Sequence, residues 1–443
     1  MTILTKLFQA LDAANIRYCV VGNVACLPDI PDNDVDIIVS DDQVSKCRAL
    51  IYAFASGHGG FVVQVFEHEP GAFYHVLWFP RSDGRGQFVK IDICSNYVRF
   101  GRPFLTAAWL LEGRRKVAGR GREPLFFIAA PDREFLYYTM KKVDKDRADK
   151  AALLHLARLL KEAPDRCRTA AASIWQSQTL EQLIAAIEAG EPTVFTDVAR
   201  GARAELVHTL SVPSRSERVG EWLRRWRRVI NPTGFVVAVL GPDGAGKSTV
   251  LAGLQHRLEP AARTTVVYHL FPVIGTSRSS SIVVDPHSQP PRGLAAGIAK
   301  LAFLVLRYNL GWVRAVFWQV RRSALVYFDR YYQDILADPT RYRDSTPPWI
   351  VRAFARLIPQ PDIFLVLDAP PAVIRSRKIE ISEQESERQY LAYRALAASL
   401  PRGHLVDVDR PPSEIVAECE RLIMTAMASR LSHRNCRPYY DGS

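Results

Sequence analysis

The chain has 443 residues, more than a single hydrophobic core usually supports, so two or three domains are expected. Its composition, with 48% hydrophobic and 23% charged residues, is that of an ordinary globular protein. The net charge of +12 favours anionic partners such as nucleotides, phosphorylated sugars, nucleic acid or an acidic membrane surface, without choosing among them.

The seven cysteines are scattered, odd in number and without a CxxC pair, which excludes a disulfide framework and a zinc site and suits a reducing compartment. The N-terminus lacks the basic-then-apolar pattern of a signal peptide. The most apolar long segment, residues 293–318, is interrupted by Lys300, Arg307 and Arg314, so we expect it to fall short of a membrane-spanning helix. These features together predict a cytoplasmic protein.

The N-terminal half begins with an amphipathic helix (3–15), two strands ("RYCVVG" and "VDIIVS") and three further strand-like runs between residues 61 and 93. From about residue 104 to 210 the pattern becomes helical. One helix is expected to begin at "PDREFLYYTMKKV", with Asp132 as its cap, and another to cover residues 149–163.

Residues 211–234 are typical of a linker that contains a basic amphipathic helix. Its apolar residues recur at helical spacing between arginines; they are Trp222, Leu223, Trp226, Val229 and Ile230. Such a helix can lie weakly on an anionic membrane surface through residues 221–230. The alternative is a connector helix that packs its tryptophans against a domain.

After the linker, strands and helices alternate. The strands are expected at 235–240, 265–270, 324–329, 362–368 and 404–408, and the helices at 247–258, 292–322, 349–358, 371–395 and 413–429. Continuous apolar strands that alternate with helices predict a parallel sheet covered on both faces.

A glycine-rich loop separates the first of these strands from its helix, and it fits G-x-x-x-x-G-K-[ST]. Its glycines allow backbone N–H groups to face a phosphate chain, and the helix N-terminus adds a favourable dipole. Lys247 supplies a cation for the β- and γ-phosphates, and the Ser248 hydroxyl can ligate Mg²⁺. The predicted ATP-binding residues are Gly241, Pro242, Asp243, Gly244, Ala245, Gly246, Lys247, Ser248 and Thr249.

This loop and the segment "VYFDRYYQDIL" together resemble the thymidylate kinase family, whose loop carries Asp-Gly and whose later strand ends in Asp-Arg-Tyr. The segment "LVLDAPPAVIRSRK" matches the family's strand end followed by a basic lid, and the resemblance extends from Phe235 to about Met427. It implies that Asp329 and Arg330 serve the Mg²⁺ site and the acceptor phosphate, and that lid residues cover the transferring group. The predicted catalytic residues are Lys247, Asp329, Arg330, Asp243, Arg375 and Arg377, with Lys378 and Arg388 as further lid candidates.

The acceptor side departs from the family. Where the family has Phe-Pro-Arg, this chain has Phe271, Pro272 and Val273, and the Ala-Tyr-Gln that follows Asp-Arg-Tyr is missing. An apolar side chain cannot neutralise an acceptor phosphate. Nearby polar residues are left as candidates for acceptor contacts: Arg278, Asp285, His287 and Arg292.

A second group of candidate site residues lies in the N-terminal half, where Gly22-Asn23 is followed by Asp34-Val-Asp36 on one expected strand and Asp92 on another. Asp34 and Asp36 point to the same face of their strand. Three carboxylates on adjacent strands suit Mg²⁺ ions that clamp a triphosphate. The pattern resembles the nucleotidyltransferase superfamily, although its members usually have Gly-Ser or Gly-Gly where this chain has Gly22-Asn23. The resemblance implies that Asp34, Asp36 and Asp92 are metal ligands. They would form a second metal site, separate from the one expected at Ser248 and Asp329.

The expected fold class is therefore α/β, with a C-terminal parallel-sheet P-loop kinase domain and an N-terminal α+β nucleotidyltransferase-like domain with a helical extension. The expected limits are 1–110 for the nucleotidyltransferase-like domain, 111–212 for the helical extension, 213–232 for the linker, 233–430 for the kinase domain and 431–443 for a tail. The leading hypothesis is an ATP- and Mg²⁺-dependent kinase for a nucleotide or another phosphorylated or hydroxylated small molecule, such as a sugar. The alternatives are nucleotidyl transfer by the N-terminal domain and a nucleotide-gated adaptor; a homodimer is left open.

Overall fold

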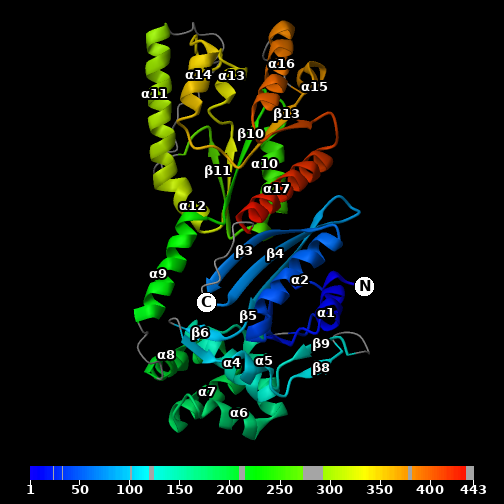
Figure 1. Cartoon of the computed structure of the whole chain (residues 1–443), viewed down its shortest axis with the longest axis vertical. Coiled ribbons are helices and arrows are strands. Elements are labelled where there is room, and N and C mark those ends of the chain that lie inside the picture. The colour runs from blue at the N-terminus through cyan, green and yellow to red at the C-terminus, as the bar shows by residue number, and fades with distance from the viewer. Residues whose placement is uncertain are drawn as a thin grey trace. The chain divides into compact units, whose positions relative to one another are not determined.

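The computed structural model describes residues 1–22, 24–31, 33–99, 102–118, 124–208, 215–272, 293–377 and 382–435. Its residues group into two compact units. One unit contains Met1–Leu77 and Val89–Arg225, and the other contains Trp78–Phe88 and Trp226–Ser443. Figure 1 shows a sheet and surrounding helices in each unit.

The first unit is built on a seven-stranded sheet of order β3–β4–β5–β2–β1–β9–β8 (Figure 1). The strands are β1 (Tyr18–Val21), β2 (Val35–Val39), β3 (Phe61–Glu69), β4 (Ala72–Pro80), β5 (Gly86–Cys94), β8 (Arg115–Val117) and β9 (Phe126–Ile128). Strand β2 pairs with β1 in antiparallel and with β5 in parallel. A separate antiparallel pair is formed by β6 (Tyr97–Arg99) and β7 (Arg102–Leu105).

Most helices of this unit lie after residue 104, as the sequence predicted. They are α1 (Ile3–Ala13), α2 (Val44–Gly57), α3 (Ala107–Leu111), α4 (Pro131–Asp144), α5 (Lys150–Glu162), α6 (Pro164–Ala171), α7 (Ser177–Ala189) and α8 (Pro192–His208). The prediction that Asp132 caps α4 is wrong, because Ala130 is the N-cap and Pro131, whose fixed φ suits the first helical position, begins the helix. Asp132 instead accepts a hydrogen bond of 2.6 Å from Arg166 on α6.

The second unit contains a five-stranded sheet of order β11–β12–β10–β13–β14 (Figure 1), in which all four neighbouring pairs are parallel. The strands are β10 (Phe235–Leu240), β11 (Thr264–His269), β12 (Ala324–Asp329), β13 (Ile363–Asp368) and β14 (Gly403–Asp407). This confirms the expected α/β architecture of this half. Because β10 is first in the chain and central in the sheet, the strand order reverses beside it, where ligands of open α/β sheets bind.

Helices cover both faces of this sheet. They are α10 (Lys247–Arg257), α11 (Leu294–Gly311), a π-helical turn (Trp312–Val316), α12 (Phe317–Arg321), α13 (Asp334–Ala337), α14 (Pro348–Ala355), α15 (Pro371–Arg377), α16 (Glu383–Ser399) and α17 (Pro412–Asn435). Alternate residues of β10, Val236, Ala238 and Leu240, enter the core cluster that α11 and α16 also supply. The single helix expected at 371–395 is in fact two, because Ser382 caps a new helix by accepting from the Glu385 N–H at 3.3 Å.

The basic helix of the linker, α9 (Arg215–Ile230), was expected either to contact a membrane or to connect the two domains. In α9, Trp222 and Trp226 are 56% and 49% exposed, and the connector helix stays a prediction. Membrane contact through residues 221–230 stays a prediction.

Within the described residues, one helical segment, Leu294–Arg321, is long and apolar enough to cross a membrane by length and composition alone. That test considers length and composition only, so the expectation that the segment falls short of a membrane-spanning helix stays a prediction.

Candidate functional site

The glycine-rich loop between β10 and α10 has a backbone that only glycine adopts readily. Gly241, Gly244 and Gly246 have φ values of 148°, 85° and 89°. At Gly241 a Cβ would also meet Leu367 Cβ at 3.1 Å. These glycines turn the chain tightly from the central strand into the N-terminus of α10, which is the arrangement that presents backbone N–H groups to an anion.

Lys247 is the buried cation of this loop. Its Nζ donates hydrogen bonds of 2.9 Å and 2.7 Å to the carbonyl oxygens of Gly241 and Pro242. Burial, and then the charge of Arg330, lowers the pKa of Lys247 to about 8. Ser248 and Thr249, which follow it on α10, are exposed. The loop therefore combines a concentrated positive charge with two accessible hydroxyl groups.

Asp329 stands at the carboxyl end of β12, the strand beside β10. Its Oδ2 lies 3.4 Å from His269 Nδ1 at the end of β11. Its Oδ1 is buried, and no hydrogen-bond partner for it is present among the described residues. Although burial raises the pKa of Asp329, the hydrogen bond to His269 and the charge of Lys247 bring it below its ordinary value. An ionised carboxylate with a bare oxygen suits a divalent cation.

Arg330 is held in a strained backbone conformation, with φ of 72°, and its side chain is almost completely buried. Its guanidinium donates 2.6 Å to Asp334 Oδ2 through Nη1 and pairs with Asp243 of the glycine loop through Nη2. Asp243 also pairs with Arg341 and lies 3.6 Å from Lys247. Burial raises the pKa of Asp243, but the three cations, led by Arg330, bring it well below its ordinary value. The predicted residues Asp243, Lys247 and Arg330 are therefore brought together.

Sequence reasoning missed the buried anchor of this cluster. Asp334 is fully buried in α13 and accepts hydrogen bonds from the hydroxyl groups of Tyr342 (2.9 Å) and Tyr393 (2.7 Å) as well as from Arg330. It also missed Arg341. The only signal was the density of charged residues and tyrosines in "DRYYQDILADPTRYRD", which does not show which side chains meet.

The proposed lid is only partly described. The side chains of Arg375 and Arg377, on α15, and the residue Lys378 lie outside the described part of the chain. Arg388, on α16, donates to Glu385 at 2.7–2.8 Å and to the Ala337 carbonyl at 3.2 Å. These bonds tie Arg388 to its own helix and to α13.

On the acceptor side, the guanidinium of Arg307 lies over the ring of Phe271 at 3.5 Å. Val273, Arg278, Asp285, His287 and Arg292 all lie outside the described residues.

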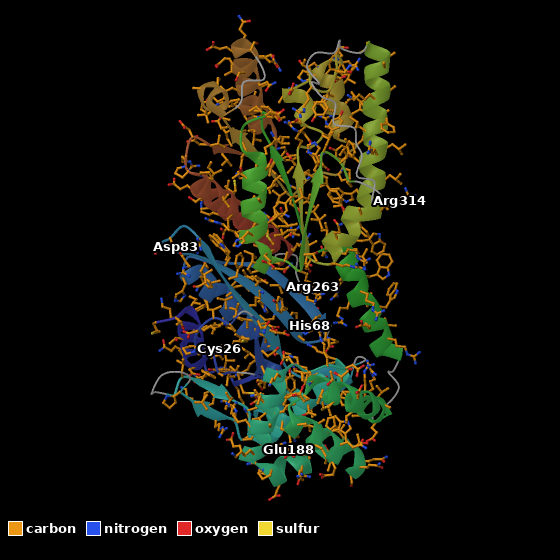
Figure 2. The ribbon with its side chains drawn as sticks, turned by 180° about the vertical axis from the view of Figure 1, so that it is seen from behind. Cys26, His68, Asp83, Glu188, Arg263 and Arg314 are labelled. Atoms are coloured by element: carbon orange, nitrogen blue, oxygen red, sulfur yellow. The ribbon has the colours of Figure 1, made fainter. Side chains whose placement is uncertain are left out.

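The second predicted cluster, in the first unit, also comes together. The parallel register of β2 and β5 sets Asp36 opposite Asp92, and one carboxylate oxygen from each of Asp34, Asp36 and Asp92 lies within 4.8 Å of the others. Burial, reinforced by Asp36, raises the pKa of Asp92 to about 8, and the same two causes raise the pKa of Asp34. His68, labelled in Figure 2, reaches Asp92 with its Nε2 at 3.5 Å. Concentrated carboxylates of this kind are a donor set for a divalent cation.

Lys141 of α4, which sequence reasoning did not single out, donates a hydrogen bond of 2.7 Å to Asp36 Oδ2. Its ammonium is thus a built-in counter-ion of the cluster. Gly22 has φ of 92°, and its N–H donates 3.0 Å to Glu134, which is itself bonded to His155 at 2.7 Å. Asn23 lies outside the described residues.

No protein-family model matches the chain. The chain is similar to curated thymidylate kinases: 27% identical over 216 residues to that of Xanthomonas campestris pv. campestris (strain B100), 27% over 231 residues to that of Xanthomonas oryzae pv. oryzae (strain PXO99A), and 29% over 227 residues to that of Xanthomonas euvesicatoria pv. vesicatoria (strain 85-10). Each comparison covers 46% of this chain and 88–89% of the relative.

The parallel sheet, the glycine loop and the following helix are consistent with a P-loop kinase. The comparisons support the more particular statement that part of this chain is a thymidylate kinase-like P-loop kinase. They do not bear on the nucleotidyltransferase resemblance.

Proposed function

We propose that the chain is an ATP- and Mg²⁺-dependent kinase that phosphorylates a nucleotide, and that its second unit carries the reaction. The observation that carries this proposal is the joining of Asp243, Lys247 and Arg330 at the carboxyl end of the parallel sheet. The similarity to thymidylate kinases favours a nucleotide acceptor over the sugar that the sequence left open. The domain limits and the cytoplasmic location expected from the sequence belong to this proposal.

The donor side fits ATP and Mg²⁺, since the glycine loop offers backbone N–H groups and the bare oxygen of Asp329 offers a metal ligand. When bound, the metal nucleotide supplies the phosphoryl group and offsets its negative charge. Lys247 would bind the phosphate chain as a fixed cation, while Ser248 and Asp329 would hold the metal. Because these groups are already in place, little reorganisation is needed during the reaction.

Arg330 would bind the acceptor phosphate. Its buried ion pair with Asp334 fixes the guanidinium, so the side chain is oriented before substrate arrives. The lid arginines Arg375 and Arg377 would contribute further positive charge over the transferring group. A phosphate dianion brought into such a site needs paired cations, because unpaired it would carry a large desolvation cost.

The test is the variant Lys247→Ala, compared with Lys161→Ala, which removes an exposed lysine of α5. Loss of the loop cation should lower ATP-dependent ADP formation on the order of a thousandfold, equivalent to about 4 kcal/mol of transition-state stabilisation, while thermal unfolding still shows a folded protein. Lys161→Ala should keep wild-type activity. Near wild-type ADP production by Lys247→Ala would show that this loop is not the catalytic site.

A second candidate function is nucleotidyl transfer by the first unit. It is supported by the convergence of Asp34, Asp36 and Asp92, which suits a metal-held triphosphate. The products separate the candidates, because a kinase releases ADP and a nucleotidyltransferase releases pyrophosphate. Absence of both products would favour the nucleotide-gated adaptor.

A further inference from the structure

The loop between α13 and α14 brings a second arginine to the glycine-rich loop. Arg341 pairs through Nη1 with Oδ2 of Asp243, while Arg330 pairs through Nη2 with Oδ1 of the same carboxylate. Two guanidinium groups are therefore held side by side on one carboxylate, which is itself 39% exposed. Because like charges this close repel each other, Asp243 is the group that keeps both cations in place before a substrate arrives.

The two arginines differ in how much of each a substrate can reach. The Arg330 side chain is 3% exposed, and both of its Nη atoms contact carboxylates, those of Asp334 and Asp243. The Arg341 side chain is 23% exposed, and its guanidinium donates to a described residue through Nη1 alone. A guanidinium carries five N–H donors, so Arg341 keeps most of its donors for a ligand. The accessible cation of the pair is therefore Arg341.

The segment that carries Arg341 is anchored to two buried aspartates. The backbone N–H of Arg341 donates 3.2 Å to Oδ1 of Asp338, which is almost completely buried. The next residue, Tyr342, is also buried, and its hydroxyl donates 2.9 Å to Asp334. Because Arg341 and its neighbour are both held in this way, the position of the side chain is set in advance, and little ordering is left to occur when a ligand binds.

The contacts of Asp243 favour the acceptor over the donor as the ligand of Arg341. Lys247, the cation assigned to the phosphates of the donor, lies 3.6 Å from Oδ1 of Asp243, the oxygen that Arg330 also contacts. Arg341 contacts the other oxygen, so the carboxylate stands between Arg341 and Lys247. A phosphate that reaches Arg341 and Arg330 together would therefore approach from the side of Asp243 away from the donor.

The charges of this group also favour an anion over a purely structural role. Three cations, Lys247, Arg330 and Arg341, contact only two described carboxylates, those of Asp243 and Asp334. The group therefore carries a net positive charge, which attracts an anion. A partly exposed ion pair adds little to stability, so the pair of Arg341 with Asp243 is weakly explained as a structural support.

We propose that Arg341 binds the phosphate of the acceptor together with Arg330, so that the acceptor is a phosphate monoester and not an alcohol without a phosphate group. This inference rests on the proposed kinase function. The phosphate dianion of the acceptor contacts the outward N–H groups of Arg341, whose planar fork matches two phosphate oxygens. A lysine at this position would supply the charge but not the paired donors.

The test is steady-state ADP formation by the full-length protein with MgATP and the monophosphates of adenosine, guanosine, cytidine, uridine and thymidine, beside the same nucleosides without phosphate. For the monophosphate that wild type uses, Arg341→Met should raise the KM about ten- to hundredfold, the usual loss for a hydrogen bond to a charged group. The kcat and the Kd of MgATP should stay close to those of wild type, because a contact made equally in the ground and transition states changes KM alone. Arg341→Lys should raise the KM less. The matched control is Arg352→Met, an exposed arginine of α14, which should behave like wild type.

Thermal unfolding verifies that each variant is folded, and Arg341→Lys carries the test if Arg341→Met is not. An unchanged KM, a fall in kcat without a rise in KM, or an equal loss of MgATP affinity overturns this inference while the proposed function stands, because wild type is then an active kinase. Equal use of a nucleoside and its monophosphate by wild type also overturns it. If wild type forms no ADP with any of the monophosphates, the proposed function fails, and this inference fails with it.

Discussion

Replacing Asp334 by asparagine tests the buried network that positions Arg330. The substitution keeps the shape of the side chain but removes the charge that pairs with Arg330 at 2.6 Å. Both side chains are almost completely buried, at 0% and 3% exposure, so neither charge is compensated by water. We expect the second unit to lose about 3–5 kcal/mol of unfolding free energy, the usual cost of removing one partner of a buried ion pair.

The structure places the expected value toward the lower end of that range. Arg330 keeps Asp243 as a second counter-ion, so the remaining cation is not isolated. Tyr342 and Tyr393 donate to different oxygens of Asp334, and asparagine can keep both contacts because its NH2 group can donate to the tyrosine hydroxyl at the oxygen it replaces. A loss of about 3 kcal/mol is a large part of the 5–15 kcal/mol that stabilises a typical domain.

The assay is urea unfolding of the full-length protein. The matched control is Asp344→Asn, because the Asp344 carboxylate accepts from the backbone and hydroxyl of Thr346 in its own loop. It should cost less than about 1 kcal/mol. The double variant Arg330→Met with Asp334→Asn should lose clearly less than the sum of the single variants, as coupled partners do. A single Asp334→Asn variant within about 1 kcal/mol of wild type would refute the argument.

Three further predictions concern other parts of the chain. Burial, and then the charge of Arg48, lowers the pKa of His75 to about 3. As the pH falls, the unfolded state therefore takes up a proton on His75 before the folded state does, and the unfolding free energy decreases below about pH 6.5. Between pH 7.5 and 5.5, wild type should lose about 1.4 kcal/mol more unfolding free energy in urea than His75→Leu, and equal losses would contradict this prediction. Asp34→Asn with Asp36→Asn should abolish Mg²⁺-dependent pyrophosphate release without changing ADP formation, and loss of both products would show that the units share one reaction. Thymidine monophosphate should be a poor acceptor, because Val273 stands where the family resemblance implies a phosphate-binding arginine, and one missing charge-assisted contact is worth roughly 2–5 kcal/mol. Steady-state turnover near ten per second with a micromolar KM would disprove this prediction.

The conformation of the glycine-rich loop could be predicted because it depends on consecutive residues. The positive φ values of Gly241, Gly244 and Gly246 are ones that glycine alone tolerates well, and the strand before and helix after them follow from local patterns. The carboxylate cluster was predictable for a similar reason, although Asp34 comes directly before β2 and only Asp36 lies on that strand. Residues two apart in an extended chain share a face, and a single strand pairing adds Asp92. Lys141 escaped notice because a lysine in the last turn of a helix is ordinarily explained by the helix dipole.

Asp334 and Arg341 could not be predicted, since their roles depend on side chains that only the tertiary fold brings together. Tyr393 reaches Asp334 from α16, across 59 positions of sequence, and Arg341 reaches Asp243 across 98. From sequence, an aspartate after two tyrosines is as compatible with a solvated helix face as with a fully buried anchor. The difference follows the chemistry of the two substrates. A phosphate donor can be bound by backbone N–H groups, which depend on local conformation, whereas an acceptor is chosen by side-chain charges gathered from separate elements. The donor half of such a site can therefore be predicted from consecutive residues of the sequence, whereas the acceptor half depends on side chains that only the tertiary fold brings together.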